Sequence, residues 1–409
     1  MIKWGLFTKK RSLIIIGIMA IICIAAIAIG LYFHLARTEE EVYTHAAITT
    51  NGYPCADIGR DILKRKGSAV EAAIAALFCD GVVCLQSMGL GGGFLMTIYE
   101  KNNNKVITLN AREKAPKNAN ETMFNGNKTL AEKGGLAVAV PGELKGYWEA
   151  YNRYKSGNVE WADLIQPTID LCRKGITVTA YFARFLKLKE EDIKNSPTLS
   201  EILIDKKTNS VWKKGDVFKR LKLADTLEII KMEKADALYN GSLTDNFIND
   251  IKELGGIITK EDLAEYSPEW TAPVVTQLKD NITLYTAPLP GSGILLTFML
   301  NILDGFIPTK NTITNFQRII ETFKYGYGQR THFGDPKFVD SKTISELIQQ
   351  LTSKSYAESV RQKISDNRTS QDPAYYGAEV VMPEDHGTAH ITVLAPNGDA
   401  VSVTSTINL

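Results

Sequence analysis

Asp385-His386-Gly387-Thr388-Ala389-His390 is the stretch of this 409-residue chain on which the interpretation of its fold depends. A Gly-Thr junction that opens a strand is suited to self-cleavage, because Gly387 has no Cβ and tolerates the strained backbone that cleavage requires. Thr388 could attack the Gly387 carbonyl, and its freed α-amine would then serve as the base for its own hydroxyl. The alternative is ordinary, since threonine favours the start of a strand without any chemistry.

The residues after this junction are predicted to form a hairpin, with strands at 388–395 and 399–406. Pro396-Asn397-Gly398 favours a three-residue loop with Gly398 in the left-handed region, whereas a two-residue Asn-Gly loop would shift the register by one. In the first register Thr388 faces Thr406, and Asn408 falls on the same face. That face is polar: Thr388, His390, Thr392, Ser402, Thr404 and Thr406. The opposite face is apolar and would pack on a core: Ala389, Ile391, Val393, Val401 and Val403.

Hydrophobic periodicity predicts a chain of mixed helices and strands before the hairpin. Helices are expected within 55–78 (two, the second begun by a Ser68/Glu71 capping box) and at 143–154, 161–174, 222–231, 294–303, 315–327 and 345–363. Strands are expected at 94–99, 106–109 and 281–285, and a charge-rich lobe at 187–222. The glycines at 89–93 precede a strand rather than a helix, so they indicate tight turns and close packing rather than a dinucleotide fingerprint.

Composition excludes several classes of function. The formal net charge is +1 and there is no basic arm, so nothing favours nucleic acid as a partner. The five cysteines (Cys23, Cys55, Cys79, Cys84 and Cys172) are too few for a disulfide scaffold and have no zinc spacing. No metal constellation or cofactor motif is present in the sequence.

The N-terminus predicts a membrane anchor. Residues 12–33 carry no charge, and 22 residues span about 33 Å as a helix. Lys9, Lys10 and Arg11 precede them, which predicts a cytoplasmic tail at 1–11, a signal-anchor at 12–33, a linker at 34–46 and the bulk of the chain outside. We therefore expect a single-pass type II protein of the plasma membrane. A cleaved signal peptide and a buried core helix are the alternatives.

An external location would make the N-glycosylation sequons relevant. Each has Ser or Thr two residues on and no intervening proline. They occur at Asn120, Asn127, Asn240, Asn281 and Asn367.

Several blocks in order along the chain resemble the γ-glutamyltransferase (glutathione hydrolase) family. The maturation site corresponds to residues 385–390 followed by Ser405-Thr406-Ile407-Asn408-Leu409. The upstream blocks are Gln86–Phe94, Asn110-Ala111-Arg112-Glu113, Val140-Pro141-Gly142, Leu254–Ile257 and Ala287–Gly293. The resemblance covers the family's large subunit (47–387 here) and only the first strands of its small subunit (388–409).

The resemblance implies a four-layer α/β/β/α sandwich of N-terminal-nucleophile hydrolases, formed as two subunits from one precursor. It implies cleavage at Gly387-Thr388, Thr388 as the nucleophile, and Arg112 as the clamp for the substrate's α-carboxylate. Thr406 and Asn408 would hydrogen-bond the nucleophile and the glutamyl group, and Cys55 would pair with Cys79. The implied substrates are glutathione and other γ-glutamyl compounds, with amino acids or peptides as acceptors.

Some of these residues have plainer interpretations. Arg112 could simply form an ion pair with Glu113, and Thr406 and Asn408 could serve strand pairing alone. His386 and His390 flank Thr388, but a threonine with its own amine needs no histidine, so no triad is expected.

The sequence also departs from the family, because the long segment that follows Asn408 in other members is not present. That segment supplies the family's oxyanion hole and its ligands for the substrate amino group, and loss of one oxyanion donor alone costs roughly 10²–10³ in rate. We therefore expect a truncated, weakly active or inactive form with an incomplete sandwich. The alternative is a catalytically dead, membrane-anchored homologue that acts as a binding or structural ectodomain.

Overall fold

The structure is a computed structural model that describes residues 19, 45–380 and 387–408. The chain divides into two units, Met1–His45 and Ala46–Leu409, and the fold below is that of the second unit. The predicted membrane span at 12–33 lies outside the described residues, apart from residue 19. Among the residues that are described, no helix has the length and apolar character needed to cross a bilayer.

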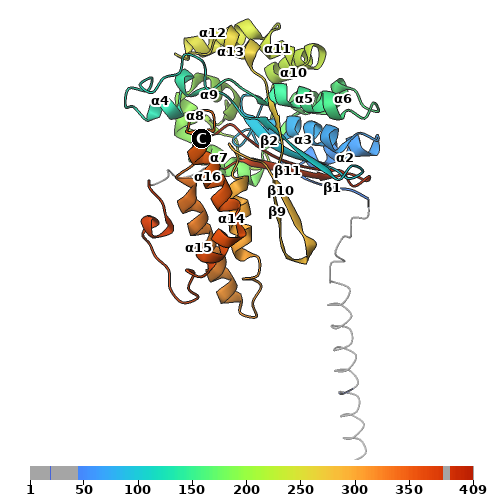
Figure 1. The fold of residues 1–409 in the computed structure, drawn as a ribbon. Helices are drawn as coiled ribbons and strands as arrows, with labels where there is room; N and C mark the ends of the chain where they lie inside the picture. Colours follow the sequence, from blue (N-terminus) through green and yellow to red (C-terminus); the bar gives the residue numbers. More distant parts are fainter. Residues whose placement is uncertain (1–18, 20–44, 381–386, 409) are drawn as a thin grey trace, which may run out of the picture. The chain divides into compact units, whose positions relative to one another are not determined.

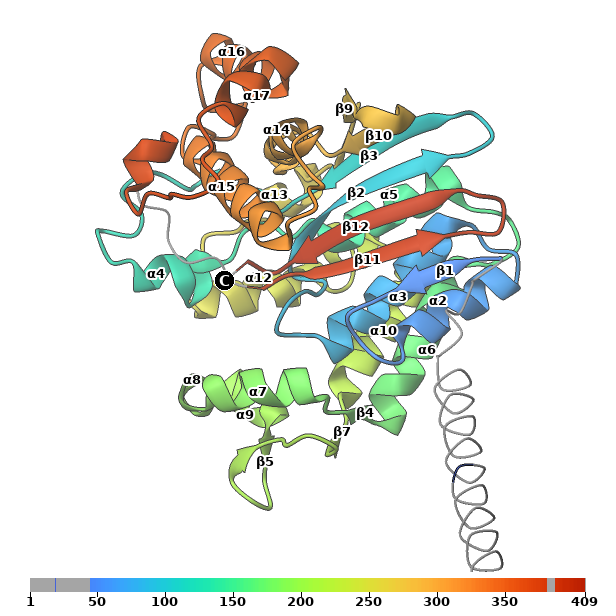
Figure 2. The same cartoon turned by 90° about the horizontal axis from the view of Figure 1, so that it is seen from below.

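A six-stranded antiparallel sheet forms the centre of the second unit (Figure 1). Its strands, in spatial order, are β1 (Ala47–Thr49), β11 (Ala389–Leu394), β12 (Ala400–Thr406), β2 (Gly93–Glu100), β3 (Lys105–Ala111) and β8 (Glu269–Thr271). The C-terminal hairpin thus lies between strands from the first part of the chain, as Figure 2 shows. Its residues are held by ladders on both sides rather than at an edge.

The predicted hairpin register is confirmed. Ala389 pairs with Ser405 and Leu394 with Ala400. The Ala395 N–H donates to the Asp399 carbonyl over 2.9 Å, and Gly398 has φ of +85°, as the three-residue loop requires. Both strands are slightly shorter than predicted. Thr388 therefore lies one residue before β11, on the side of the sheet fixed by this register.

Helices cover the apolar face of the hairpin. Ile391, Val393 and Val403 are fully buried, while His390, Thr392, Ser402 and Thr404 on the other face are exposed. The helix against the buried face is α3 (Ala69–Val83), which contacts both hairpin strands, with α2 (Cys55–Lys64) packed beside it. The predicted Ser68/Glu71 capping box starts α3. Because nearly every residue of α3 is buried, it is apolar on all sides rather than amphipathic.

Most of the other predicted helices are confirmed, two of them to the residue: α5 (Glu143–Tyr154) and α6 (Trp161–Lys174). The later predictions correspond to α10 (Leu221–Glu233), α14 (Gly293–Leu303) and α15 (Thr312–Arg330). The charge-rich lobe contains three short helices, α7 (Ala180–Leu188), α8 (Glu190–Asn195) and α9 (Pro197–Leu203). Two pairs of short strands accompany them: β5 (Ile204–Asp205) with β6 (Ser210–Val211), and β4 (Ile176–Thr177) with β7 (Val217–Phe218). Short helices α4 (Thr129–Glu132), α11 (Asp236–Tyr239), α12 (Thr244–Glu253) and α13 (Lys260–Glu265) complete this part.

Two predictions of secondary structure were wrong in detail. The single helix expected at 345–363 is two helices, α16 (Ser341–Thr352) and α17 (Lys354–Arg361), because Ser353 is extended and its hydroxyl accepts from the Tyr356 N–H to cap the second. The strand expected at 281–285 is β10 (Thr283–Thr286), paired with β9 (Val274–Gln277). Asn281 instead has φ of +58° in a turn.

The sheets other than the central one have two strands each within the described residues. The mixed α/β class is therefore confirmed, whereas the second broad sheet of a four-layer sandwich is not formed by this part of the chain. The lobe of α14 to α17 has a small core of its own, centred on Phe298, Ile302 and Leu351.

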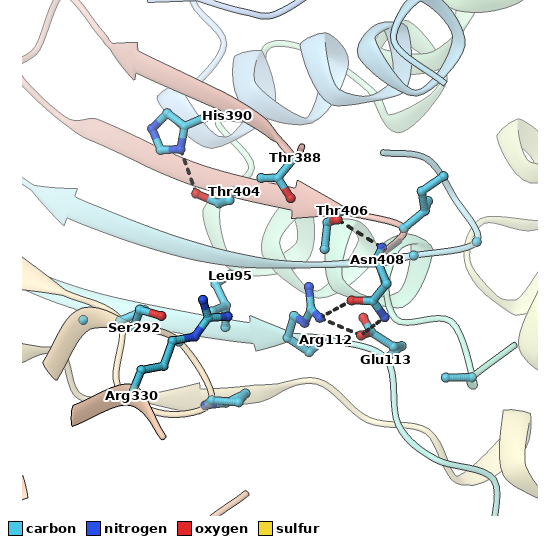
Figure 3. Close-up of a pocket in the computed structure, with 18 of the residues that line it drawn as sticks. Leu95, Arg112, Glu113, Ser292, Arg330, Thr388, His390, Thr404, Thr406 and Asn408 are labelled. Atoms are coloured by element: carbon cyan, nitrogen blue, oxygen red, sulfur yellow. Dashed lines mark hydrogen bonds and ion pairs between the residues drawn. The ribbon is translucent and has the colours of Figure 1, made fainter. Parts of the chain in front are cut away.

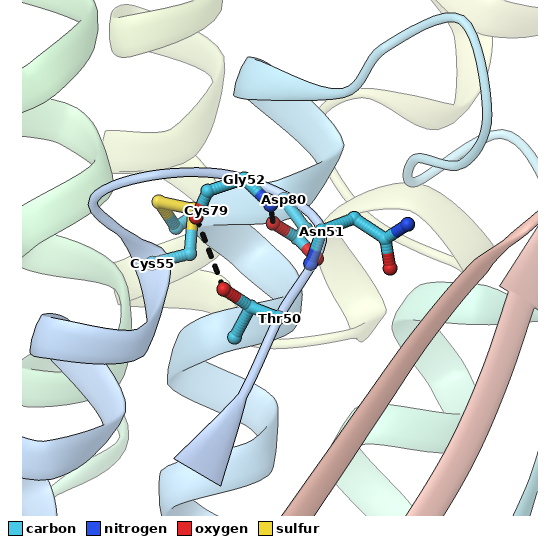
Figure 4. Close-up of a disulfide and its surroundings, with 6 residues drawn as sticks. All are labelled: Thr50, Asn51, Gly52, Cys55, Cys79 and Asp80. Carbon is cyan, nitrogen blue, oxygen red and sulfur yellow. Dashed lines mark hydrogen bonds between the residues drawn. A yellow bond between two sulfur atoms is a disulfide. The ribbon is translucent and has the colours of Figure 1, made fainter. Parts of the chain in front are cut away.

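The Cys55–Cys79 disulfide implied by the resemblance is present, with a Cα–Cα distance of 5.4 Å (Figure 4). It joins the first residue of α2 to α3, next to a loop in which the Asn51 and Gly52 N–H groups donate to the Asp80 carboxylate. The Asn51 side chain in turn accepts from the His390 N–H over 2.8 Å, so this loop extends the pairing of β1 with β11 toward Thr388. Cys84 and Cys172 are buried free thiols.

We expect the double substitution Cys55→Ala/Cys79→Ala to lower the free energy of unfolding by about 3 kcal/mol, because the bridge closes a loop of 24 residues in the unfolded chain. Urea denaturation under oxidising conditions measures this. Cys172→Ala is the control for loss of a buried sulfur atom without loss of a bridge. Equal stability of the double variant and the control would show that the bridge does not stabilise the fold.

Candidate active site

A cleft of about 1140 Å³ opens over the polar face of the sheet, at the end where β12 terminates. It brings together the four residues predicted from the sequence to act on substrate, which come from three distant segments: Arg112, Thr388, Thr406 and Asn408. Figure 3 shows their side chains grouped on one side of this cleft. The cleft therefore brings the predicted site residues together.

Arg112 is the centre of a small polar cluster. Its Nη2 donates to Glu113 Oε1 over 2.7 Å and to Asn408 Oδ1 over 2.9 Å. The Asn408 amide donates to the same Glu113 oxygen over 2.9 Å, closing a triangle. The plainer interpretation of Arg112, an ion pair with Glu113, is thus also correct. The same guanidinium nevertheless reaches the end of the hairpin, which a merely local pair would not require.

The backbone around Arg112 is fixed from several directions. Its N–H donates to the Asn110 side chain, and its carbonyl accepts from the Tyr266 hydroxyl over 2.9 Å. The glycine block makes the close backbone packing that was predicted, and its neighbour is the hairpin, since a Cβ on Gly92 would lie 2.0 Å from the Thr406 carbonyl oxygen. Gly92 also accepts from the Gly142 N–H over 2.9 Å, which ties the start of α5 to the same point. These contacts bring Arg112 and the hairpin into one site.

Thr388 is exposed one residue before β11, and Figure 3 shows it in the cleft near Thr406. Thr406 is buried, and its hydroxyl accepts from the Asn408 N–H over 3.1 Å. That bond holds Asn408 in a left-handed conformation (φ +68°), which turns its amide toward Arg112. Gly387 is described and exposed, whereas His386 lies outside the described residues.

His390, two residues after Thr388, makes its side-chain contacts with hydroxyl groups of the sheet. His390 Nδ1 contacts the Thr404 hydroxyl at 2.7 Å, and Nε2 contacts the hydroxyls of Thr392 at 3.1 Å and Ser402 at 3.3 Å. Partial burial lowers its pKa, so the neutral ring is favoured. Both ring nitrogens of His390 are thus engaged by hydroxyl groups of the sheet.

Comparison with known proteins gives the decisive result, because residues 55–409 match the family model described as gamma-glutamyltranspeptidase. The chain belongs to the gamma-glutamyltranspeptidase family. Rat glutathione hydrolase 5 proenzyme is 36% identical over 415 residues, covering 99% of this chain and 71% of that protein. Scoloptoxin SSD14 of Scolopendra dehaani is 42% identical over 374 residues, covering 90% of this chain and 64% of that protein. The chain thus spans roughly two thirds of these relatives.

Solved structures of the family support the fold assignment. The γ-glutamyltranspeptidase of Helicobacter pylori aligns with a TM-score of 0.74 and 26% identity, covering 85% of this chain and all of that one. The enzyme of Pseudomonas nitroreducens, complexed with L-DON, aligns with a TM-score of 0.71 and 28% identity, covering 81% and 98% of the two chains. The family resemblance inferred from the sequence motifs is therefore confirmed.

The sequence analysis missed a buried carboxyl group that contacts the β11–β12 hairpin. Glu143 is fully buried at the start of α5, where its Oε1 accepts from the Ser405 hydroxyl over 2.8 Å and from the Tyr147 hydroxyl. Its Oε2 has no hydrogen-bond partner among the described residues. Burial raises its pKa to about 8, so the neutral acid is favoured. The signal in the sequence was its position directly after Val140-Pro141-Gly142.

Two cleft residues were also given no role from the sequence. Ser292 precedes α14 inside the Ala287–Gly293 block, and Arg330 ends α15. Both line the cleft, and in Figure 3 the Arg330 side chain extends from α15 toward Leu95. Periodicity placed both helices but could not show that their ends meet at the sheet, since that depends on tertiary packing.

Glu143 makes stability depend on pH. Between pH about 4.5 and about 8 the unfolded chain loses this proton while the folded chain keeps it, so the free energy of unfolding falls as pH rises through this window. Asp80 is also buried, and burial raises its pKa to about 7, so it too lowers the free energy of unfolding as pH rises. In Glu143→Gln we expect the part of this pH-dependent decrease that is due to Glu143, on the order of a few kcal/mol in the free energy of unfolding, to be absent. Urea denaturation at pH 5 and pH 8 measures it, with exposed Glu121→Gln as the control; an unchanged pH dependence in Glu143→Gln would contradict this account.

Proposed function

We propose that this protein is a γ-glutamyltransferase of the glutathione hydrolase type, in which Thr388 accepts the γ-glutamyl group of glutathione and related compounds. The observation that carries the proposal is that Arg112 and Asn408 lie with Thr388 in one cleft, although they come from distant parts of the sequence. Family membership supports the same chemistry. The names of relatives such as rat glutathione hydrolase 5 proenzyme point to glutathione as the substrate.

The first step is maturation of the chain. Thr388 Oγ attacks the Gly387 carbonyl carbon, the Gly387–Thr388 peptide bond breaks, and the acyl group moves from nitrogen to oxygen as an ester. Water hydrolyses that ester, which leaves a carboxylate on Gly387 and a free α-amine on Thr388. Such a step needs a rigid surround. Pairing of β11 on both sides, and of the Asn51 side chain with His390, supports this requirement.

Transfer then uses the freed threonine. Its α-amine takes the hydroxyl proton as Oγ attacks the γ-amide carbonyl, and it returns the proton to the departing amine. The glutamyl ester on Thr388 is resolved by water, which gives glutamate, or by the amine of an amino acid or peptide, which gives a new γ-glutamyl compound. No cofactor takes part in this scheme.

Arg112 would hold the α-carboxylate of the substrate. Its contacts to Glu113 and Asn408 both use Nη2, so further donors of the planar guanidinium remain for a carboxylate. Asn408 can then turn its amide toward the glutamyl group, and Thr406 supports Asn408 through its hydroxyl. These roles fit the positions of the three side chains around Thr388.

The proposed location is the outer side of the plasma membrane, with 12–33 as the anchor. Two observations support an oxidising, secretory environment. The Cys55–Cys79 disulfide is formed. The asparagines of all five sequons are exposed: Asn120, Asn127, Asn240, Asn281 and Asn367.

The nucleophile assignment predicts specific processing. Expression of the chain should yield a new N-terminus at Thr388, and the rate at which the purified protein releases the amine from a chromogenic γ-glutamyl amide tests the weak activity expected from the sequence. Thr388→Ala should abolish both, and Thr388→Ser should retain both at a reduced rate because the hydroxyl is kept. Mass spectrometry and the amine-release assay measure these outcomes. Processing without turnover would favour the alternative, a catalytically dead ectodomain, while an intact Gly387–Thr388 bond would remove the maturation step.

The clamp assignment predicts a selective defect. Arg112→Lys keeps the charge but loses the planar fork, so KM for γ-glutamyl substrates should rise about tenfold or more. The melting temperature should change little, because the guanidinium contacts are partly exposed. Steady-state kinetics and thermal denaturation on the same preparation separate the two effects. An unchanged KM would remove Arg112 from the substrate site.

The membrane assignment predicts that protease added to sealed microsomes will digest only the short N-terminal tail, because the bulk of the chain would lie in the lumen. Endoglycosidase treatment of the protected chain should lower its apparent mass if the sequons are used. Replacing Lys9, Lys10 and Arg11 with glutamine is the matched control, since it removes the charge bias that sets the orientation. Digestion of the large domain from the cytosolic side would contradict the assignment.

A further inference from the structure

The Gly387–Thr388 junction has a neighbour that comes from a distant helix. Both residues of the junction are exposed. A Cβ placed on Gly387 would lie 3.3 Å from the hydroxyl oxygen of Tyr181, which belongs to α7. Because a Cβ is one bond from its Cα, this hydroxyl lies within about 5 Å of the Gly387 Cα, the atom that carries the scissile carbonyl group.

The Tyr181 side chain is held by its helix and not by its hydroxyl. The Thr179 hydroxyl accepts from the Phe182 N–H over 3.1 Å, which fixes the start of α7. The ring of Tyr181 packs on the ring of Phe185, one turn further along, with the centroids 4.9 Å apart. The side chain is 46% exposed, and its hydroxyl makes no hydrogen bond within the described part of the chain. A hydroxyl placed in this way is available as a donor beside the junction.

Self-cleavage creates a negative charge on the Gly387 side of the junction. When Thr388 Oγ bonds to the carbonyl carbon, the carbonyl electron pair moves to the oxygen, which becomes an oxyanion. When that pair returns, the C–N bond breaks and the nitrogen takes the proton that left the hydroxyl. Hydrogen bonds to such an oxyanion lower the barrier strongly. Among the described residues no group donates to the Gly387 carbonyl oxygen, so the maturation step still needs a donor.

We propose that the Tyr181 hydroxyl donates a hydrogen bond to the Gly387 carbonyl oxygen as this oxygen becomes the oxyanion of self-cleavage. The inference rests on the proposed function, because it assumes maturation at Gly387–Thr388. The hydroxyl keeps its proton throughout, so Tyr181 makes and breaks no covalent bond. The two groups have to approach by a short distance, as is common for hydrogen bonds that tighten only in the transition state.

The test follows the rate at which the full 409-residue chain is cleaved. Cells that express it receive a short pulse of labelled amino acids, and samples are denatured at successive times. Mass spectrometry then gives the fraction of labelled chain that ends at Gly387. We expect Tyr181→Phe to slow cleavage about tenfold or more, which is less than the loss of a fully buried donor because water reaches this exposed site. The melting temperature should not change, since the contact with the Phe185 ring is kept.

Tyr181→Ala separates the hydroxyl from the ring, because it removes both. If the hydroxyl is the active group, the alanine and phenylalanine variants should be slowed alike. A parental rate in Tyr181→Phe, with slow cleavage only in Tyr181→Ala, would show that ring packing matters instead and would overturn the inference. A lower melting temperature of Tyr181→Phe would overturn it too, because slow cleavage would then follow from loss of folding.

Tyr327→Phe is the matched control, because it removes the hydroxyl of another exposed tyrosine, which does not contact Gly387. It should be cleaved at the parental rate, and equal slowing of this variant would contradict a specific role for Tyr181. Normal cleavage of Tyr181→Phe would overturn this inference and leave the proposed function intact. A parent chain whose Gly387–Thr388 bond stays intact would overturn the inference together with the maturation step.

Discussion

The site depends on the register of one hairpin. Because side chains alternate along a strand, a slip of β12 by one residue against β11 would move Thr404 to the core and Val403 to solvent. The pairing of Ala389 with Ser405 prevents this, and it is reinforced by β1 on one side and β2 on the other. The chemistry proposed for Thr388 is thus built on a strand pair in the middle of the sheet.

The second constraint is the close approach of backbone segments around the hairpin's end. Gly92 has no room for a side chain against Thr406, and Gly142 has none against the Ala111 carbonyl. These contacts place Arg112 beside Asn408 and put Glu143 directly beneath Ser405. Burial of that carboxyl is costly unless it is neutral, so the raised pKa of Glu143 follows from the same packing. The proposed substrate site and the stability of the fold therefore depend on one set of contacts.

The sequence predicted the parts that depend on local pattern. The Pro396-Asn397-Gly398 turn determined the hairpin register, the Ser68/Glu71 box located the start of α3, and periodicity found α5 and α6 to the residue. The assignment of Arg112 and Asn408 to one substrate site came from family resemblance, since no local rule connects residues so far apart. Glu143, Ser292 and Arg330 were missed because their importance arises from tertiary packing. The break at Ser353 was missed because an apolar periodicity continued across it.

The central claim is that Arg112 and Thr388 act on one γ-glutamyl group. It is tested most directly by a glutamine analogue whose side-chain carbonyl carries a reactive leaving group, with the modified residue located by mass spectrometry. The account predicts a covalent adduct on Thr388 in the parent chain, suppressed by excess glutathione and greatly slowed by Arg112→Lys. Labelling of another residue, or labelling of Thr388 that is indifferent to both glutathione and Arg112→Lys, would contradict it.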